Sequence, residues 1–397
     1  MNEPEADYPC SSQESRYNNK CGEELWSAEE ECYGGPGAGD ADGDTDGDTD
    51  GDADSCMGDG TEHSSFSIDD DIDEIILEED YMYVLGGDDY SKESTLIAIA
   101  DVSDPKTPRL VSGNGNAFDD AYCMAKEGDY LYVFTFEEYI PGINADSSIH
   151  VFDVSDPERD PPEVAVVGMS SSGYIPAMAQ AVDGYIYLAA YQEYHEDTMF
   201  RIFDVSTPSN PVRVGTTTID AGFPEAMLLG PDDTVYLGFN NKDFMESGSI
   251  RMVDVSYKQT PLIVGDTIDF DVPVQGLAAE GTRLFATTTM INPSDSYVGY
   301  LYQYDIEDSR APVKLGELRV GDSKFFSITV DRNLAYVDDG SGLNLLNISD
   351  PENMSIMEHI YQDAYQIHLF PGDDSLLYIY DSWYDQIRVY DRCPQPQ

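Results

Sequence analysis

Asp residues occupy every second position in the stretch 40–54, which reads DADGDTDGDTDGDAD. Carboxylates at short regular spacing are ligands that calcium prefers, and an EF-hand loop adds a bidentate Glu at its twelfth position. When the loop is taken to begin at Asp42 or Asp46, the twelfth residue is Ala53 or Met57. Two interpretations stay open, a solvated spacer that attracts calcium loosely and an ordered calcium site. The ligands of an ordered site would be Asp42, Asp44, Asp46, Asp48, Asp50 and Asp52.

Four cysteines, Cys10, Cys21, Cys32 and Cys56, lie in the same N-terminal region. They are widely spaced and form no Cys-x-x-Cys pair, so a zinc site is not expected. Disulfide bonds formed in an oxidising compartment explain the pattern better, and four cysteines permit three connectivities. Cys123 lies in an apolar run and is expected to be a buried free thiol.

The formal net charge is −58, from 78 acidic and 20 basic residues. Residues 1–60 hold 18 of the acidic residues, so the rest of the chain is acidic in its own right. A field of this sign repels nucleic acid and anionic lipid, and it favours cations and basic partners. An acid-rich surface also keeps proteins soluble in high salt, which is a second explanation for the composition.

Residues 1–61 are predicted to form a disordered, acidic, cysteine-bearing stalk or linker. They contain few aliphatic side chains, so they cannot bury enough apolar surface to offset the entropy cost of ordering. The chain contains no apolar run of 18 residues, and no transmembrane segment is expected. The first residues lack the basic and apolar regions of a signal peptide, so an export signal or anchor is expected outside this sequence.

A short phrase recurs through residues 62–397. DVSDP occurs at Asp101–Pro105 and again at Asp153–Pro157, and five further copies follow, of which the last three are weaker; the steps between copies are 42–52 residues. Its Asp and Ser side chains can accept or donate hydrogen bonds to the backbone of a turn, and Pro ends a strand ladder. The remaining copies are DVSTP at Asp204–Pro208, DVSYK at Asp254–Lys258, DIEDS at Asp305–Ser309, NISDP at Asn347–Pro351 and DRCP at Asp391–Pro394.

Each copy of the phrase is surrounded by the same four strand-like runs. A run of small apolar residues such as Ala177–Ala181 comes first, followed by an aromatic run such as YIYLA around Tyr187. A third run leads into the phrase, and a fourth follows it, often ending in Gly as at Gly215. Four antiparallel strands repeated at this period form the blade of a propeller. The sequence therefore predicts an all-β fold, a seven-bladed β-propeller of four-stranded antiparallel blades.

The seventh unit ends shortly after its phrase, without a fourth strand. We expect the run SSFSI at residues 64–68 to supply that strand and close the ring. Closure would remove an open sheet edge, which otherwise invites aggregation.

With the phrase and its flanks, residues 64–397 resemble the LVIVD-repeat family of extracellular and surface-associated β-propellers. The resemblance rests on the aromatic run, the strand ending in DVSDP and the Pro-led strand closing in Val-Gly. It is specific in the first four units and weaker in the last three, where Asp308, Asn347 and Arg392 depart from the pattern. The family implies architecture and location, and it carries no catalytic motif to transfer.

The candidate binding face consists of the hairpins between the second and third strands and of the blade-to-blade connections. Aromatic rings interleaved with carboxylates suit a basic or cationic ligand, and they could equally hold a calcium ion in the channel. Alternatively, the hairpins are polar only because they are exposed, and the aromatics merely fill the axis. The candidate residues are Tyr139, Tyr191, Glu193, Tyr194, His195, Phe244, Trp383 and Tyr384 in hairpins, and Asp119, Asp120, Tyr174, Phe223, Asp271, Asp363 and Tyr365 in connections.

No Gly-x-Ser-x-Gly, His-Glu-x-x-His or phosphate-loop motif occurs in the sequence. The leading prediction is a monomeric, non-enzymatic propeller, secreted or on the cell surface, that binds a protein, peptide or glycan. A second hypothesis is a calcium-dependent propeller hydrolase with the cation in its central channel. A third is a structural surface component without a discrete ligand.

Overall fold

The computed structural model describes residues 62–67, 71–87, 95–104, 106–114, 121–136, 147–169, 173–192, 197–240, 247–291, 297–321, 327–339, 342–361, 367–371, 376–381 and 386–391. The chain divides into two units, Met1–Asp52 and Ala53–Gln397. The calcium and disulfide predictions for the first 61 residues lie outside the described residues.

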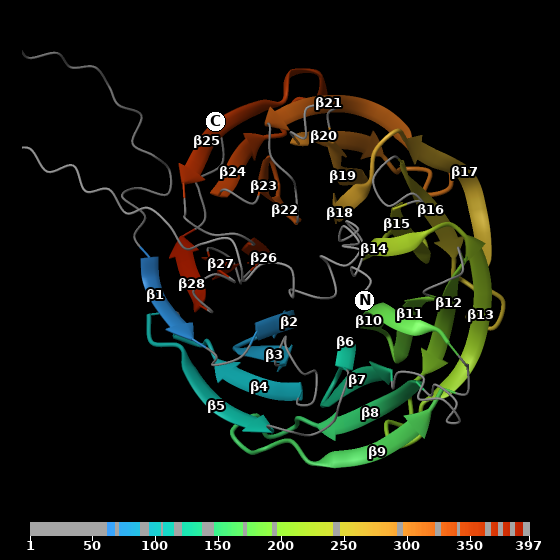
Figure 1. Ribbon diagram of the computed structural model, residues 1–397, viewed down its shortest axis with the longest axis vertical. Coiled ribbons are helices and arrows are strands. Elements are labelled where there is room, and N and C mark those ends of the chain that lie inside the picture. The colour runs from blue at the N-terminus through green and yellow to red at the C-terminus, as the bar shows by residue number, and fades with distance from the viewer. Residues whose placement is uncertain are drawn as a thin grey trace, which may run out of the picture. The chain divides into compact units, whose positions relative to one another are not determined.

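The described residues of the second unit form seven four-stranded antiparallel sheets, which confirms the predicted seven-bladed propeller (Figure 1). Each sheet is one blade, and in blades 1–6 the strands follow the chain from the inner to the outer strand. Blade 1 consists of β2 (Asp71–Glu78), β3 (Tyr81–Gly87), β4 (Thr95–Asp101) and β5 (Arg109–Asn114); blade 2 of β6 (Ala121–Glu127), β7 (Tyr130–Phe136), β8 (Ser147–Asp153) and β9 (Glu163–Gly168); blade 3 of β10 (Ile175–Val182), β11 (Tyr185–Tyr191), β12 (Asp197–Asp204) and β13 (Val212–Asp220).

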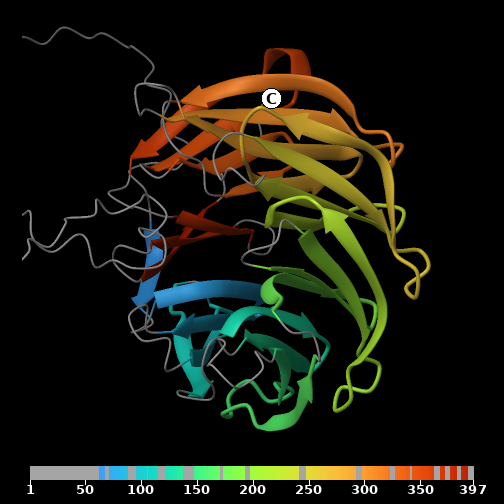
Figure 2. The same cartoon turned by 45° about the vertical axis from the view of Figure 1, so that its right-hand side comes forward.

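The remaining blades follow the same plan, and Figure 2 shows how their outer strands wrap around the inner ones. Blade 4 consists of β14 (Phe223–Leu229), β15 (Thr234–Asn240), β16 (Gly248–Asp254) and β17 (Leu262–Phe270); blade 5 of β18 (Val274–Glu280), β19 (Arg283–Ile291), β20 (Tyr297–Asp305) and β21 (Val313–Gly321); blade 6 of β22 (Ile328–Asp331), β23 (Leu334–Asp338), β24 (Gly342–Asn347) and β25 (Ser355–Tyr361), with a 3-10 turn at Pro351–Asn353; blade 7 of β26 (Ile367–Pro371), β27 (Leu376–Asp381), β28 (Gln386–Asp391) and β1.

The ring is closed by β1 (Glu62–Ser67), which is the outer strand of blade 7. It pairs antiparallel with β28, with Phe66 opposite Ile387. The backbone N–H of Ile72, at the start of blade 1, donates to the hydroxyl oxygen of Tyr380 in blade 7 at 3.2 Å. Residues from both ends of the propeller sequence therefore share one sheet.

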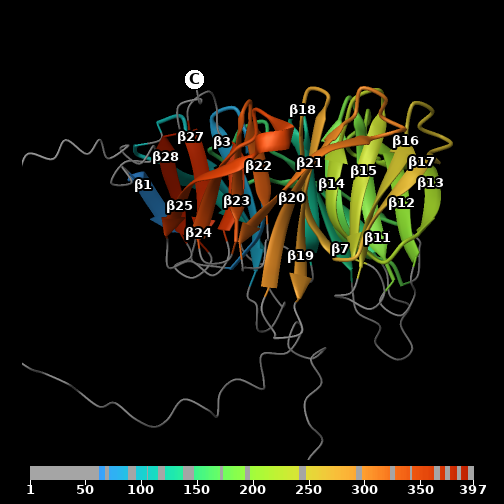
Figure 3. The same ribbon diagram turned by 90° about the horizontal axis from the view of Figure 1, so that it is seen from above.

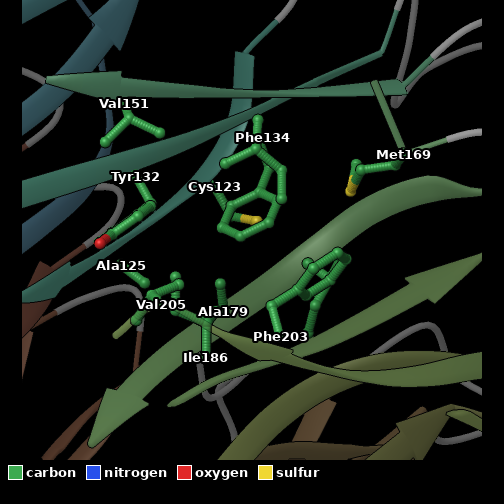
Figure 4. Close-up of a cluster of buried hydrophobic side chains, with 12 residues drawn as sticks. Cys123, Ala125, Tyr132, Phe134, Val151, Met169, Ala179, Ile186, Phe203 and Val205 are labelled. Carbon is green, nitrogen blue, oxygen red and sulfur yellow. The ribbon is translucent and has the colours of Figure 1, made fainter. Parts of the chain in front are cut away.

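Seven clusters of buried apolar side chains fill the spaces between neighbouring blades. Figure 4 shows the cluster between blades 2 and 3, where Phe134 of β7 lies 6.4 Å from Phe203 of β12, centroid to centroid. The predicted free cysteine, Cys123, is buried in this cluster with 1% exposure. Since every blade contributes to two clusters, the apolar core is a ring of interfaces rather than a single centre.

The recurring Asp-Val-Ser phrase forms a corner between the third and outer strands. A carboxylate oxygen of Asp153 accepts two hydrogen bonds from Ser155, one from the backbone N–H at 3.0 Å and one from the side-chain hydroxyl at 2.6 Å. These hydrogen bonds lower the pKa of Asp153 because they favour the ionised carboxylate. The following residue, Val154, is buried between blades, and its N–H donates to the carbonyl of Asp129 at 2.8 Å. The phrase thus joins a turn, a core position and the neighbouring hairpin.

The glycine that often ends the fourth run contacts the next blade. A Cβ atom on Gly316 of β21 would lie 1.9 Å from the carbonyl oxygen of Pro351, in the corner of blade 6. Gly215 and Gly265 meet the next corner in the same way. In blade 1 the equivalent residue is Ser112, whose hydroxyl donates to the carbonyl of Pro157 at 2.7 Å. The outer strands therefore pack directly against the neighbouring corner.

Candidate functional site

The two faces of the propeller differ in the turns that they carry. Because the four strands alternate in direction, the hairpins between second and third strands lie on the same face as the blade-to-blade connections. We call this the loop-rich face. The opposite face carries the Asp-Val-Ser corners and the short turns between inner and second strands, and we call it the corner face. Figure 3 shows the blades from the side, between these two faces.

Four of the predicted binding residues lie within the described residues: Tyr174, Tyr191, Phe223 and Asp271. The other predicted residues of this face lie outside the described residues, so their positions remain predictions. They are Tyr139, Glu193, Tyr194, His195, Phe244, Trp383, Tyr384, Asp119, Asp120, Asp363 and Tyr365.

Tyr191 and Phe223 meet across the interface between blades 3 and 4. Their ring centroids are 4.8 Å apart with an interplanar angle of 64°. Tyr191 also packs against a small apolar cluster formed by Phe136 and Ile175, and Tyr122 lies edge-on to Phe136 at 6.2 Å. We call these five residues the inner aromatic cluster. The cluster extends from blade 2 to blade 4 on the loop-rich face, at the end of the blades where the inner strands begin and the second strands end. Within it, Tyr122, Tyr191 and Phe223 are partly exposed.

Small residues at the start of the third strands hold the blade-to-blade connections in place. The hydroxyl of Ser147 donates to the carbonyl of Tyr174 at 3.0 Å, and that of Thr198 donates to the carbonyl of Gly222 at 2.9 Å. Both hydroxyl-bearing residues are fully buried. The backbone that presents Tyr174 and Phe223 is therefore fixed by the blade that precedes it.

Asp271 is exposed beside a second aromatic group between blades 4 and 5. Phe270 lies 5.1 Å from Tyr302, which stacks on Tyr300 at 6.2 Å. Burial raises the pKa of Tyr302 most, and the nearby charges of Glu317 and Asp271 add to this effect. The structure thus places Asp271 beside the aromatic group of blades 4 and 5, whereas Tyr191 and Phe223 form a different ring contact, between blades 3 and 4.

The inner strands carry polar side chains that sequence reasoning overlooked. Glu74 of β2 accepts a hydrogen bond from the backbone N–H of Met124 in β6 at 2.6 Å, and Gln180 of β10 donates to the carbonyl of Met227 in β14 at 3.0 Å. Burial raises the pKa of Glu74 to about 8, against the lowering effect of the Met124 hydrogen bond, and Asp73 raises it further. Side chains of one inner strand therefore satisfy backbone groups on the next.

Arg201 was also missed by sequence reasoning. Its guanidinium group is fully buried, and it lies over the ring of the predicted residue Tyr174 at 5.5 Å. In the run MFRIF the sequence does not show that the arginine points into an interface. Both faces of a blade are covered by neighbouring blades, so the sequence has no polar face and apolar face to tell apart. Only the three-dimensional register shows it.

Within the described ranges, no group of three or more His, Cys, Asp or Glu side chains is placed to hold a metal ion. In the same ranges, no helix is long and apolar enough to cross a membrane. The hydrolase hypothesis therefore has no cluster of three acidic side chains for its channel calcium among these residues.

No protein-family model and no curated protein matches the sequence. Among solved structures, the WD40 domain of coronin from Toxoplasma gondii has a TM-score of 0.55 at 10% identity, covering 84% of this chain and 87% of that chain. Sqt1 from Saccharomyces cerevisiae has a TM-score of 0.54 at 8% identity, covering 83% and 98%. Sqt1 from Chaetomium thermophilum has 0.53 at 11% identity, covering 83% and 97%.

These similarities establish the class of the protein, a seven-bladed β-propeller, and at such identities they establish the fold alone. The LVIVD-repeat family has no matching model, so membership in it stays a prediction.

Proposed function

We propose that this chain is a non-enzymatic binding propeller that holds a protein, peptide or glycan on its loop-rich face. The observation that carries the proposal is the inner aromatic cluster, whose rings Tyr122, Tyr191 and Phe223 are partly exposed on three consecutive blades. Rigid aromatic rings with one face accessible are the side chains that most often anchor a bound partner. The excess of acidic residues favours a partner with basic groups.

The experiment compares binding to arrays of basic peptides and of glycans by the full chain and two variants. The variant Tyr191→Ser/Phe223→Ser alters the loop-rich face. The control Tyr257→Ser removes a tyrosine that is 74% exposed on the corner face. We expect the double variant to lose the ligands that the wild type retains, because two anchoring rings are gone, while the control keeps them.

Equal binding by wild type and both variants would refute the use of this face. If the wild type binds nothing on either array, or in a pull-down from the fluid or cell surface around it, the structural-component hypothesis gains support instead. Thermal unfolding of each variant shows whether a loss of binding reflects a loss of folding.

We propose an extracellular or cell-surface location for the same protein. The support is the resemblance of the phrase to LVIVD repeats and the four cysteines of the N-terminal region, which suit disulfide bonds outside the cytoplasm. Digestion of intact cells with a protease that does not enter them should remove the chain. A chain that stays intact until the cells are broken would contradict this location.

A further inference from the structure

Arg201 is fully buried although it carries a positive charge. It lies on β12, the third strand of blade 3, on the same side as Phe203, because residues two apart on a strand share a face. Phe203 belongs to the cluster between blades 2 and 3, so Arg201 also faces blade 2.

The guanidinium group of Arg201 has weak partners. Its Nε and Nη2 atoms lie 3.1 and 3.0 Å from the sulfur of Met199, and a thioether is a poor acceptor. Its Nη1 atom is buried without a hydrogen-bond partner. In the part of the chain that the structure covers, no carboxylate pairs with this group, although a buried charge is normally paired.

A second arginine lies on the same face of blade 3. Arg213 of β13 stands opposite Phe203 in the register and is exposed. It too forms no ion pair with a carboxylate among the described residues. Burial lowers the pKa of Arg201 to about 10, and the charge of Arg213 lowers it further. The two arginines repel each other and pair with no carboxylate in the described part of the chain, although the chain contains 78 acidic residues. The charge that is missing at this place is therefore that of an anion.

We propose that Arg201 and Arg213 bind an oxyanion group of a ligand, a carboxylate, sulfate or phosphate, at the interface between blades 2 and 3. Guanidinium groups pair with such oxyanions through two parallel hydrogen bonds, and Nη1 of Arg201 is the donor left over for one of them. Tyr174 supports the guanidinium plane through its ring. The site goes beyond the proposed function, since it uses none of the residues of the inner aromatic cluster.

The test uses the full chain with sodium sulfate, sodium acetate and methyl phosphate as probes. The net charge of −58 repels every free anion, so binding is measured in about 0.5 M NaCl. At this salt concentration, screening limits the range of electrostatic interactions to a few ångströms. Calorimetric titration gives the dissociation constant of each probe, and thermal unfolding at constant ionic strength gives the change in Tm. The order of the three probes identifies the class of oxyanion.

Three variants separate a site from a general salt effect. Arg201→Met removes the buried charge and Arg213→Gln the exposed one. Arg251→Met is the matched control: Arg251 also precedes the corner Asp by three residues, in blade 4, and its Nε is also buried without a partner, but its Nη1 donates a hydrogen bond to Thr267. We expect saturable binding in wild type and Arg251→Met, on the order of tenfold weaker binding in Arg213→Gln, and none in Arg201→Met.

Equal responses of all four proteins would overturn the proposal, because stabilisation by exclusion of sulfate and similar salts does not depend on one residue. If Arg201→Met fails to fold, Arg213→Gln decides, since Arg213 is exposed and its replacement leaves the core intact. Loss of array binding in the Tyr191/Phe223 variant, with oxyanion binding kept, would show that the two sites are distinct.

Discussion

The hydroxyl group of Tyr236 in blade 4 donates a hydrogen bond to the carbonyl oxygen of Ser309 in the corner of blade 5, at 3.0 Å. Tyr132 occupies the same position of the second strand in blade 2, since both residues pair with the residue two before the corner Asp. Its hydroxyl is buried without a hydrogen-bond partner. The same position of the second strand therefore carries a tyrosine with a hydrogen-bonded hydroxyl in blade 4 and one with an unpaired hydroxyl in blade 2.

The first prediction compares Tyr236→Phe with Tyr132→Phe. Loss of the Tyr236 hydroxyl leaves a buried carbonyl with one partner fewer, so we expect the free energy of unfolding to fall by about 1–2 kcal/mol. Tyr132→Phe removes an unpaired polar atom and should leave stability unchanged or raise it. Urea unfolding of both variants measures the difference, and equal losses would contradict this account.

The second prediction concerns Gln303, whose side-chain oxygen and nitrogen are both buried without partners. It lies two residues before the corner Asp of blade 5, where blade 4 has the buried Met252. Gln303→Met should raise the free energy of unfolding by about 1–3 kcal/mol, because an unpaired buried amide is replaced by an apolar side chain. The reciprocal change Met252→Gln should lower it, and a destabilised Gln303→Met would refute the argument.

The third prediction concerns Gly316, which touches the carbonyl of Pro351 in the next corner. Gly316→Ala should destabilise the protein by about 1–3 kcal/mol, because the added methyl group overlaps backbone that cannot turn away. Gly168 at the end of β9 is the control, since a Cβ atom there would meet nothing within 4 Å. Thermal unfolding should separate the two variants, and similar Tm values would show that the blades can move apart.

The fourth prediction concerns Glu74, the inner-strand carboxyl whose pKa is raised to about 8. Between pH 4.5 and 8 the folded state holds a proton that the unfolded state has released, so stability falls as pH rises through this window. The full shift corresponds to at most about 5 kcal/mol. Glu74→Gln should flatten this slope and raise Tm at pH 8. Glu78→Gln, which removes a charge from the same strand, is the control, and an unchanged slope in Glu74→Gln would overturn the assignment.

The repeated phrase predicted the fold because its residues act locally. Asp153 binds the backbone two residues further on, and Asn347 accepts the same bond from Ser349 at 3.0 Å in blade 6, although the sequence departs from the pattern there. Seven copies of the phrase, spaced by four strand-like runs, leave few alternatives to a propeller, and the structure confirms it. The strand β1 (Glu62–Ser67) begins two residues before the run 64–68 expected to close the ring.

The candidate site was predicted less completely, for a physical reason. Tyr191 and Phe223 belong to different blades, and their contact depends on how far the blades are rotated against each other, which no local pattern records. The roles of Glu74 and Arg201 could not be predicted from the sequence for the same reason, since the side chain of each packs against a neighbouring blade. The predicted residues of the long hairpins lie outside the described ranges and remain predictions.

The pairing of β1 with β28 has a consequence for the order of events during synthesis. More than 300 residues separate Ile72 from Tyr380, which meet at the seam. At roughly 5–20 residues per second, translation needs on the order of tens of seconds to cover that distance. For all that time β1 has no partner, while six blades can already assemble outward from blade 1. The ring can therefore close only after the ribosome has passed β28, so translation sets the earliest time at which closure can happen.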